Sequence, residues 1–165
     1  MKISPEPILF IDDSARSCEY YLEYLRQKYP NTTYRSTPSE ALLHLVTNVK
    51  SESEPKCIII DIMMHCNIPG IHPKDYDHGA KAGYWLLKEI RSGYPKYKPL
   101  FVLLSNLPPN KMKVDYIDIF GQDTNISTIL LCKDDCSAKH FPDWLEQKYE
   151  IHCHQAVKQL DAPEF

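Results

Sequence analysis

The sequence predicts an α/β fold in which a doubly wound, five-stranded parallel sheet is flanked by helices on both faces. Two observations support this prediction. Short, continuous apolar runs recur along the chain, as expected for strands that helices cover on both sides. Between these runs lie segments whose apolar residues repeat with helical spacing. Strands and helices therefore alternate along the chain, which is typical of βαβ units with right-handed crossovers.

The five predicted strands differ in how clearly the sequence marks them. Four are continuous apolar runs, whereas TTYRS is a weaker candidate because its apolar and polar residues alternate. The expected ranges are 7–11 (PILFI), 32–36 (TTYRS), 57–60 (CIII), 100–104 (LFVLL) and 127–132 (STILLC).

Apolar spacing predicts a helix in each interval and one after the last strand. The second helix has the clearest start, with Thr37 as N-cap, Pro38 at the first helical position and Glu40 three residues after the cap. The first helix is expected to bury Cys18, Tyr21, Leu22, Leu25 and Tyr29, and the second Leu42, Leu45, Val46 and Val49. The later helices are expected at 83–92 with Gly93 as a stop, at 109–120 with Gly121 as a stop, and at 141–160 as one helix or two.

The composition narrows the class of protein. With 165 residues, 43% of them hydrophobic, the chain suits one domain with a packed core. The net charge of −3 gives no reason to expect nucleic-acid binding. No apolar run approaches the ~18 residues of a membrane span, and the N-terminus does not read as a signal peptide, so a cytoplasmic location is expected. Without an export signal, the six cysteines are expected to be free thiols.

Polar residues stand at the carboxyl end of each long apolar strand. Asp12 and Asp13 follow the first, Asp61 the third, Ser105 the fourth and Lys133 the fifth. In a doubly wound sheet these ends share one edge, where ligands bind. Carboxylates ~4 Å apart repel by about 4 kcal/mol per pair at an effective dielectric of about 20. Mg²⁺ and the lysine ammonium would offset that repulsion, and together with a hydroxyl they suit phosphoryl transfer onto an aspartate.

These strand ends carry a resemblance to a known family. The segments ILFIDD (8–13), IIIDIMM (58–64), FVLLS (101–105) and LLCK (130–133) resemble the motifs of response-regulator receiver domains, the CheY-like family of two-component signalling. STPSEALLHL (36–45) and GYWLLKEIRS (83–92) also resemble the corresponding passages. The resemblance covers about residues 6–150 and implies the flavodoxin/CheY-like strand order 2-1-3-4-5.

The resemblance also implies roles for single residues. Asp61 resembles the phosphorylated aspartate, Lys133 its cationic partner, and Ser105 the hydroxyl that contacts the phosphoryl group. Mg²⁺ would be bound by Asp13, by Asp61, by the backbone carbonyl of Met63, and by Asp12 through a water.

The resemblance further implies how such a chain would act. The phosphodonor would be a histidine kinase or a histidine phosphotransfer protein. The chain would be a single-domain response regulator and phosphoprotein, not an enzyme in its own right, and would signal through contact with a downstream protein or through a phosphorelay. The stretch after Tyr149 is too short for a DNA-binding output domain.

The chain departs from the family pattern in several places. The passage after Asp61 contains an insertion at about 65–82, and the single domain (1–165) is expected to end in a helical extension at about 150–165. Lys133 is followed by Asp134 where the family has proline, which leaves open whether that peptide is cis. Leu130 stands where the family has an aromatic or histidine residue.

Three other interpretations are possible. A receiver-like interaction module could act without phosphorylation, and the changes at Leu130 and Asp134 motivate this view. A phosphatase of the haloacid-dehalogenase type needs a D-x-D motif, whereas the two acids here are adjacent. The His and Cys residues of the insertion, of 132–136 and of 152–154 match no standard zinc spacing, which favours solvated or packed side chains over a zinc site.

Overall fold

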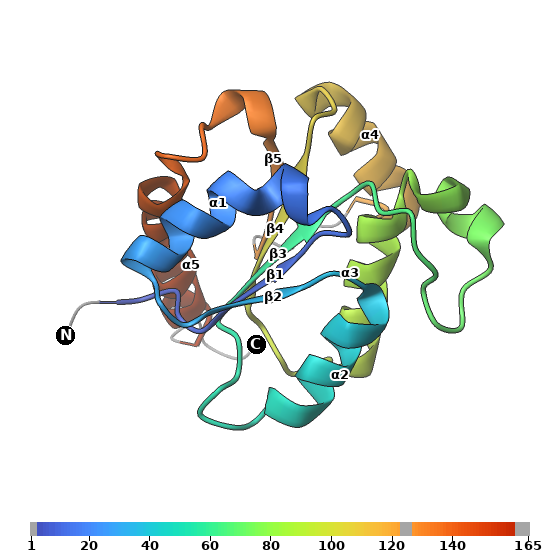
Figure 1. Ribbon diagram of the computed structural model, residues 1–165. Helices are drawn as coiled ribbons and strands as arrows, with labels where there is room; N and C mark the ends of the chain where they lie inside the picture. Colours follow the sequence, from blue (N-terminus) through green and yellow to red (C-terminus); the bar gives the residue numbers. More distant parts are fainter. Residues whose placement is uncertain (1–2, 123–126, 161–165) are drawn as a thin grey trace.

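Five parallel strands form one sheet in the order β2-β1-β3-β4-β5 in the computed structural model, which describes residues 3–122 and 127–160 (Figure 1). The predicted sheet and strand order are confirmed, including the weak second strand. The strands are β1 (Ile8–Ile11), β2 (Thr32–Arg35), β3 (Cys57–Asp61), β4 (Leu100–Ser105) and β5 (Thr128–Cys132).

Helices cover both faces of the sheet. The α-helices are α1 (Ala15–Lys28), α2 (Pro38–Asn48), α3 (Ala82–Gly93), α4 (Pro109–Phe120) and α5 (Phe141–Leu160), and two short 3₁₀ helices are η1 (Pro73–Gly79) and η2 (Lys133–Asp135). Helices α1 and α5 lie on one face, and α2, α3 and α4 lie on the other (Figure 1). Ile8 and Phe10 of β1 pack toward α1 and α5, whereas Leu9 and Ile11 pack toward the opposite helices. Burial on both faces explains why the central strands are apolar throughout.

Helix α2 begins as predicted, and three of the four residues of its predicted face meet the core: Leu45 is buried, and Leu42 and Val49 are partly buried against the same cluster. The Thr37 hydroxyl accepts a hydrogen bond from the Glu40 N–H at 3.1 Å, so Thr37 is the N-cap. The buried residues are Pro38, Ala41 and Leu45, whereas Val46 is 70% exposed. The prediction for Val46 was therefore wrong, because the spacing i, i+3, i+7 from Pro38 sets the face that meets the sheet.

The predicted ends of the later helices are partly confirmed. Gly121, with a φ of 72°, caps α4 as expected. Gly93 is instead the last residue of α3, and Tyr94 is the cap. The final segment is one helix of 20 residues, so the predicted extension is helical as far as Leu160, and residues 161–165 lie outside the described part of the chain.

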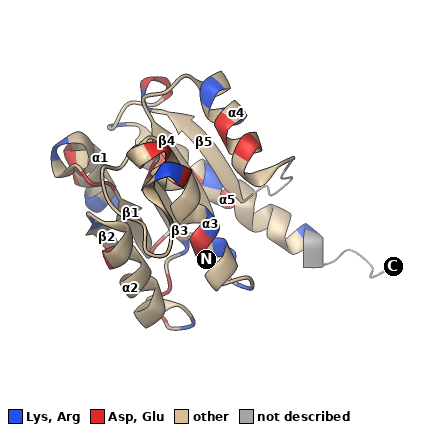
Figure 2. Ribbon diagram, turned by 90° about the vertical axis from the view of Figure 1, so that its right-hand side faces the viewer, with Lys and Arg blue, Asp and Glu red and all other residues tan. Residues whose placement is uncertain are grey.

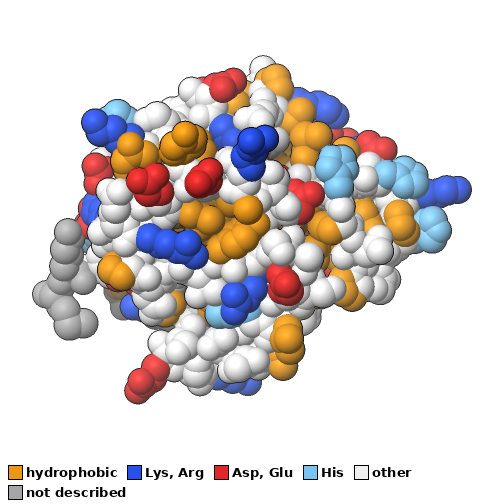
Figure 3. Space-filling model, in the orientation of Figure 1, with side chains coloured by type: hydrophobic (Ala, Val, Ile, Leu, Met, Phe, Trp, Pro, Cys, Tyr) orange, Lys and Arg blue, Asp and Glu red, His pale blue; other side chains and the backbone are white. Residues whose placement is uncertain are grey.

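The segment between β3 and α3 begins at the carboxyl end of the central strand and projects to the right in Figures 1 and 3. It includes residues 65–82, for which the sequence predicts an insertion, contains η1 and carries several histidine side chains on its surface (Figure 3). On the side seen in Figure 2, α4 carries both basic and acidic residues rather than a basic stripe. All six cysteines are free thiols, as predicted. Of the helices in the described ranges, none has the length and apolar character that crossing a bilayer requires.

Candidate functional site

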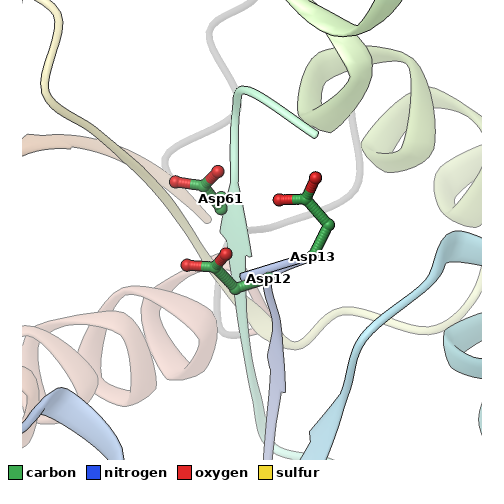
Figure 4. Close-up of side chains that lie close together, drawn as sticks. All are labelled: Asp12, Asp13 and Asp61. Carbon is green, nitrogen blue, oxygen red and sulfur yellow. The ribbon is translucent and has the colours of Figure 1, made fainter. Parts of the chain in front are cut away.

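The carboxyl ends of β1 and β3 bring three aspartates together. Asp12 and Asp13 directly follow β1, and Asp61 is the last residue of β3. The register pairs Ile11 with Ile60, so the next residues of the two strands, Asp12 and Asp61, lie side by side (Figure 4). One ligand oxygen from each carboxylate lies within 4.8 Å of the others, and Asp12 and Asp61 are buried. The predicted acidic cluster is therefore present.

The other predicted site residues lie at the same edge. Lys133 follows β5, and its Nζ is 3.3 Å from Asp61 Oδ1 and 4.0 Å from Asp12 Oδ2. The lysine side chain is only 12% exposed, so solvent screens this ion pair weakly. Ser105 ends β4, is buried, and its hydroxyl accepts a hydrogen bond from the Leu107 N–H at 3.1 Å. Met63 lies two residues beyond Asp61 with its side chain 42% exposed.

Asp12 is oriented by contacts that the sequence analysis did not identify. Its carboxylate accepts hydrogen bonds from the Ser14 N–H at 2.9 Å and from the Ser17 hydroxyl at 3.0 Å. The Tyr34 hydroxyl, from β2, donates to the Asp12 carbonyl at 2.6 Å. Ser14 is also the N-cap of α1, and a serine directly before a helix was a readable signal. Ser17 and Tyr34 had no such signal.

The turn after β5 is held by α1. The Tyr21 hydroxyl donates to the Cys136 carbonyl at 3.1 Å, and the Lys133 carbonyl lies 3.4 Å from the same hydroxyl. The turn is the 3₁₀ helix η2, which begins at Lys133. In the described residues the cis peptide bond is Glu6–Pro7, so the Lys133–Asp134 peptide is trans. This settles the question that Asp134 raised.

Asp13 contacts the inserted segment. Its Oδ2 accepts a hydrogen bond from the His65 N–H at 2.7 Å, and 52 positions separate the two residues in sequence. The contact places the first residue of the insertion at the acidic cluster.

Burial perturbs the acidity of the cluster. It raises the pKa of Asp61 to about 7, the nearby Asp12 charge adds to the increase, and Lys133 opposes it. Burial also raises the pKa of Asp12, although hydrogen bonding and Lys133 oppose the change. The ammonium group of Lys133 therefore does not offset the cost of burying these carboxylates in their charged form. The site is short of positive charge and presents oxygen ligands at one point, which fits a hard divalent cation such as Mg²⁺.

The structure gives no support to the zinc interpretation. Among residues 3–122 and 127–160, the one cluster of acidic, His or Cys side chains with metal-binding proximity is Asp12, Asp13 and Asp61. In the same ranges no such cluster includes His or Cys.

Comparisons with known proteins agree with this architecture. No protein-family model and no curated protein matches the chain. Among solved structures it is similar to the signal receiver domain of an HD domain-containing protein from Pseudomonas fluorescens, with a TM-score of 0.60, 19% identity, and 96% of each chain covered. It is similar to a putative response regulator from Chloroflexus aurantiacus, with a TM-score of 0.59, 17% identity, and 89% of this chain and 99% of that chain covered.

A two-component response regulator from Clostridium difficile is a third similar structure, with a TM-score of 0.59, 16% identity, and 87% of this chain and 94% of that chain covered. At such identities the likeness establishes the fold. The chain has the CheY-like receiver fold, as its sequence motifs predicted.

Proposed function

We propose that the chain is a single-domain response regulator that accepts a phosphoryl group on Asp61. One observation carries the proposal: at the ligand-binding edge of a receiver fold, Asp61 lies with Asp12 and Asp13 in one cluster, and Lys133 Nζ is 3.3 Å from its carboxylate. The arrangement suits phosphoryl transfer, for which positioning and charge neutralisation supply most of the catalysis.

Each residue has a role in this proposal. Asp13 and Asp61 would hold Mg²⁺ together with the Met63 carbonyl, and Asp12 would act through a water. The cation would neutralise charge on the incoming phosphoryl oxygens. Lys133 would pair with the Asp61 carboxylate and then with the phosphoryl group. The Ser105 hydroxyl would give up its hydrogen bond with the Leu107 N–H and would then contact the phosphoryl group.

The transfer itself is a displacement at phosphorus. An Asp61 oxygen forms a bond to phosphorus while the bond from phosphorus to the donor imidazole nitrogen breaks. The nitrogen keeps the electron pair and takes up a proton, so an acyl phosphate forms on Asp61. Only the ionised carboxylate is a nucleophile, and a pKa of about 7 leaves Asp61 partly protonated at neutral pH. Added positive charge at the cluster is expected to lower that pKa and raise reactivity.

The donor in the proposal is a histidine kinase or a histidine phosphotransfer protein. The output is contact with a downstream protein, or relay of the phosphoryl group. Residues 1–165 then form one receiver domain with an insertion after β3 and a C-terminal helical extension, and the location is cytoplasmic.

Phosphoryl labelling tests the proposal. Acetyl phosphate with Mg²⁺ is expected to label the wild type on Asp61, whereas EDTA or the variant Asp61→Asn is expected to abolish the label, as measured by intact-mass spectrometry. Asp118→Asn is the matched control, because Asp118 is an exposed aspartate on α4, and it should label like the wild type. The proposal fails if the wild type takes no label, or if Asp61→Asn takes as much.

A receiver-like interaction module that acts without phosphorylation is the alternative. Leu130 favours it, because a partly buried leucine packs where an aromatic switch would otherwise stand. An unlabelled wild type that still binds Mg²⁺ would support this alternative.

A further inference from the structure

The insertion after β3 is a folded unit and not a free loop. Met64, Ile68 and Tyr76 are at most 2% exposed and belong to the core cluster beneath α3. The Ile68 N–H donates to the Tyr76 hydroxyl at 3.4 Å, and the Lys81 N–H donates to the Tyr76 carbonyl at 3.1 Å. Tyr76 therefore ties the middle of the insertion to both of its ends.

A close backbone contact holds the insertion against the end of β3. The Met64 N–H donates to the Gly79 carbonyl at 3.0 Å. Gly79 has a φ of +112°, and a Cβ placed there would lie 2.5 Å from the Met64 carbonyl oxygen. Only glycine allows the two segments of the insertion, at Met64 and at Gly79, to approach this closely.

The residue after this contact reaches the acidic cluster. His65 follows Met64, and its N–H donates to Asp13 Oδ2 at 2.7 Å. A backbone N–H that donates to a carboxylate orients that carboxylate and places a partial positive charge beside it. The contact between Gly79 and Met64 therefore positions the N–H of the next residue, His65, and this N–H orients the Asp13 carboxylate.

We propose that the insertion is a positioning element for Asp13: its folded state aims the His65 N–H at the Asp13 carboxylate and thereby sets the affinity of the acidic cluster for Mg²⁺. His65 acts through its backbone, so its imidazole is not needed for this role. The inference rests on the magnesium site of the proposed function, but it does not depend on phosphoryl transfer. It assigns a task to the segment in which this chain departs most from the receiver pattern.

Two glycines in the same insertion offer a matched test. Gly79→Ala forces the Met64 contact apart, whereas Gly70→Ala also places alanine at a positive φ, of +79°, but with no atom within 4 Å of its Cβ. Gly79→Ala is expected to weaken Mg²⁺ binding about tenfold, which is near the lower limit for loss of one hydrogen bond to a charged group. Gly70→Ala is expected to bind like the wild type. Titration calorimetry with MgCl₂ measures both affinities without any phosphodonor.

A second readout separates positioning from general damage. Hydrogen exchange at the His65 amide, followed by NMR, is expected to be faster in Gly79→Ala and unchanged in Gly70→Ala. His65→Pro removes the same N–H without adding an atom at Gly79, and it should also weaken Mg²⁺ binding about tenfold.

The two proposals fail in different ways. A wild type that does not bind Mg²⁺ contradicts the magnesium site and this inference with it. If the wild type binds Mg²⁺ and folded Gly79→Ala or His65→Pro binds it with the same affinity, the positioning role of the insertion is overturned and the proposed function stays intact.

Discussion

Asparagine in place of Asp61 is expected to stabilise the metal-free protein at pH 8 by about 4 kcal/mol, because the wild type must hold a buried carboxylate in its charged form. Burial and the charge of Asp12 raise the pKa of Asp61 from an ordinary value of 3.8 to about 7. Asparagine is nearly isosteric and uncharged, so it removes this cost. Lys133 keeps Asp12 as an ionic partner at 4.0 Å.

The effect depends on pH with a definite sign. Between about pH 4 and pH 7 the folded protein retains the Asp61 proton that the unfolded chain has lost, so the contribution of Asp61 to stability falls as the pH rises. Above pH 7 the cost is constant, and below pH 4 it disappears. Asp12 acts in the same direction, because burial raises its pKa too.

Urea unfolding in EDTA at pH 4 and pH 8 measures this difference. The stability gain of Asp61→Asn should be large at pH 8 and close to zero at pH 4, whereas Asp118→Asn should change little at either pH. If Asp61→Asn were the less stable protein at pH 8, the ion pair with Lys133 would outweigh desolvation, and the assignment of a raised pKa would be wrong.

Alanine in place of Gly83 is expected to destabilise the protein by about 3 kcal/mol, the upper part of the range for overpacked cores. A Cβ at this position would lie 2.5 Å from the Asp61 carbonyl oxygen and 2.7 Å from Ile62 Cα. Both are backbone atoms at the end of β3, so no side-chain rotation relieves the contact. Helix α3 would have to move away from the strand that carries Asp61.

Gly93, at the other end of α3, is the matched control. A Cβ there meets nothing within 4 Å, and the residue has helical geometry. Gly93→Ala is expected to stabilise the protein by up to about 1 kcal/mol, because alanine loses less conformational entropy in a helix. Denaturant unfolding of the two variants should therefore shift in opposite directions. If Gly83→Ala were as stable as the wild type, the close approach of α3 to β3 would not constrain this position.

The sequence was most informative about the sheet. The central strands are buried on both faces, so their apolar runs were visible without knowledge of their neighbours. The weak strand β2 is an outer strand of the sheet with a neighbouring strand on one side only, so fewer contacts constrain its side chains. Val46 was mispredicted because helical spacing alone does not show which of two adjacent apolar faces meets the sheet.

The site was predictable to the extent that it follows from topology. In a parallel sheet all strands point the same way, so Asp12, Asp13, Asp61, Ser105 and Lys133 had to share an edge once the strands were known. The hydrogen bonds that orient the acids were not predictable. Tyr34 and His65 contact Asp12 and Asp13 from other parts of the chain. Such hydrogen bonds form only where the tertiary packing places donor and acceptor at the right distance.

The receiver topology and the charged residues at its carboxyl edge were predictable from the order of residues, because alternating strands and helices have few ways to bury their apolar faces. The behaviour of those charges, in contrast, depends on the tertiary structure. Burial raises the pKa of Asp61, and the contact of Gly79 with Met64 directs the insertion onto Asp13. Both effects arise from atoms far apart in the chain that meet only when it folds, so no local pattern of residues records them.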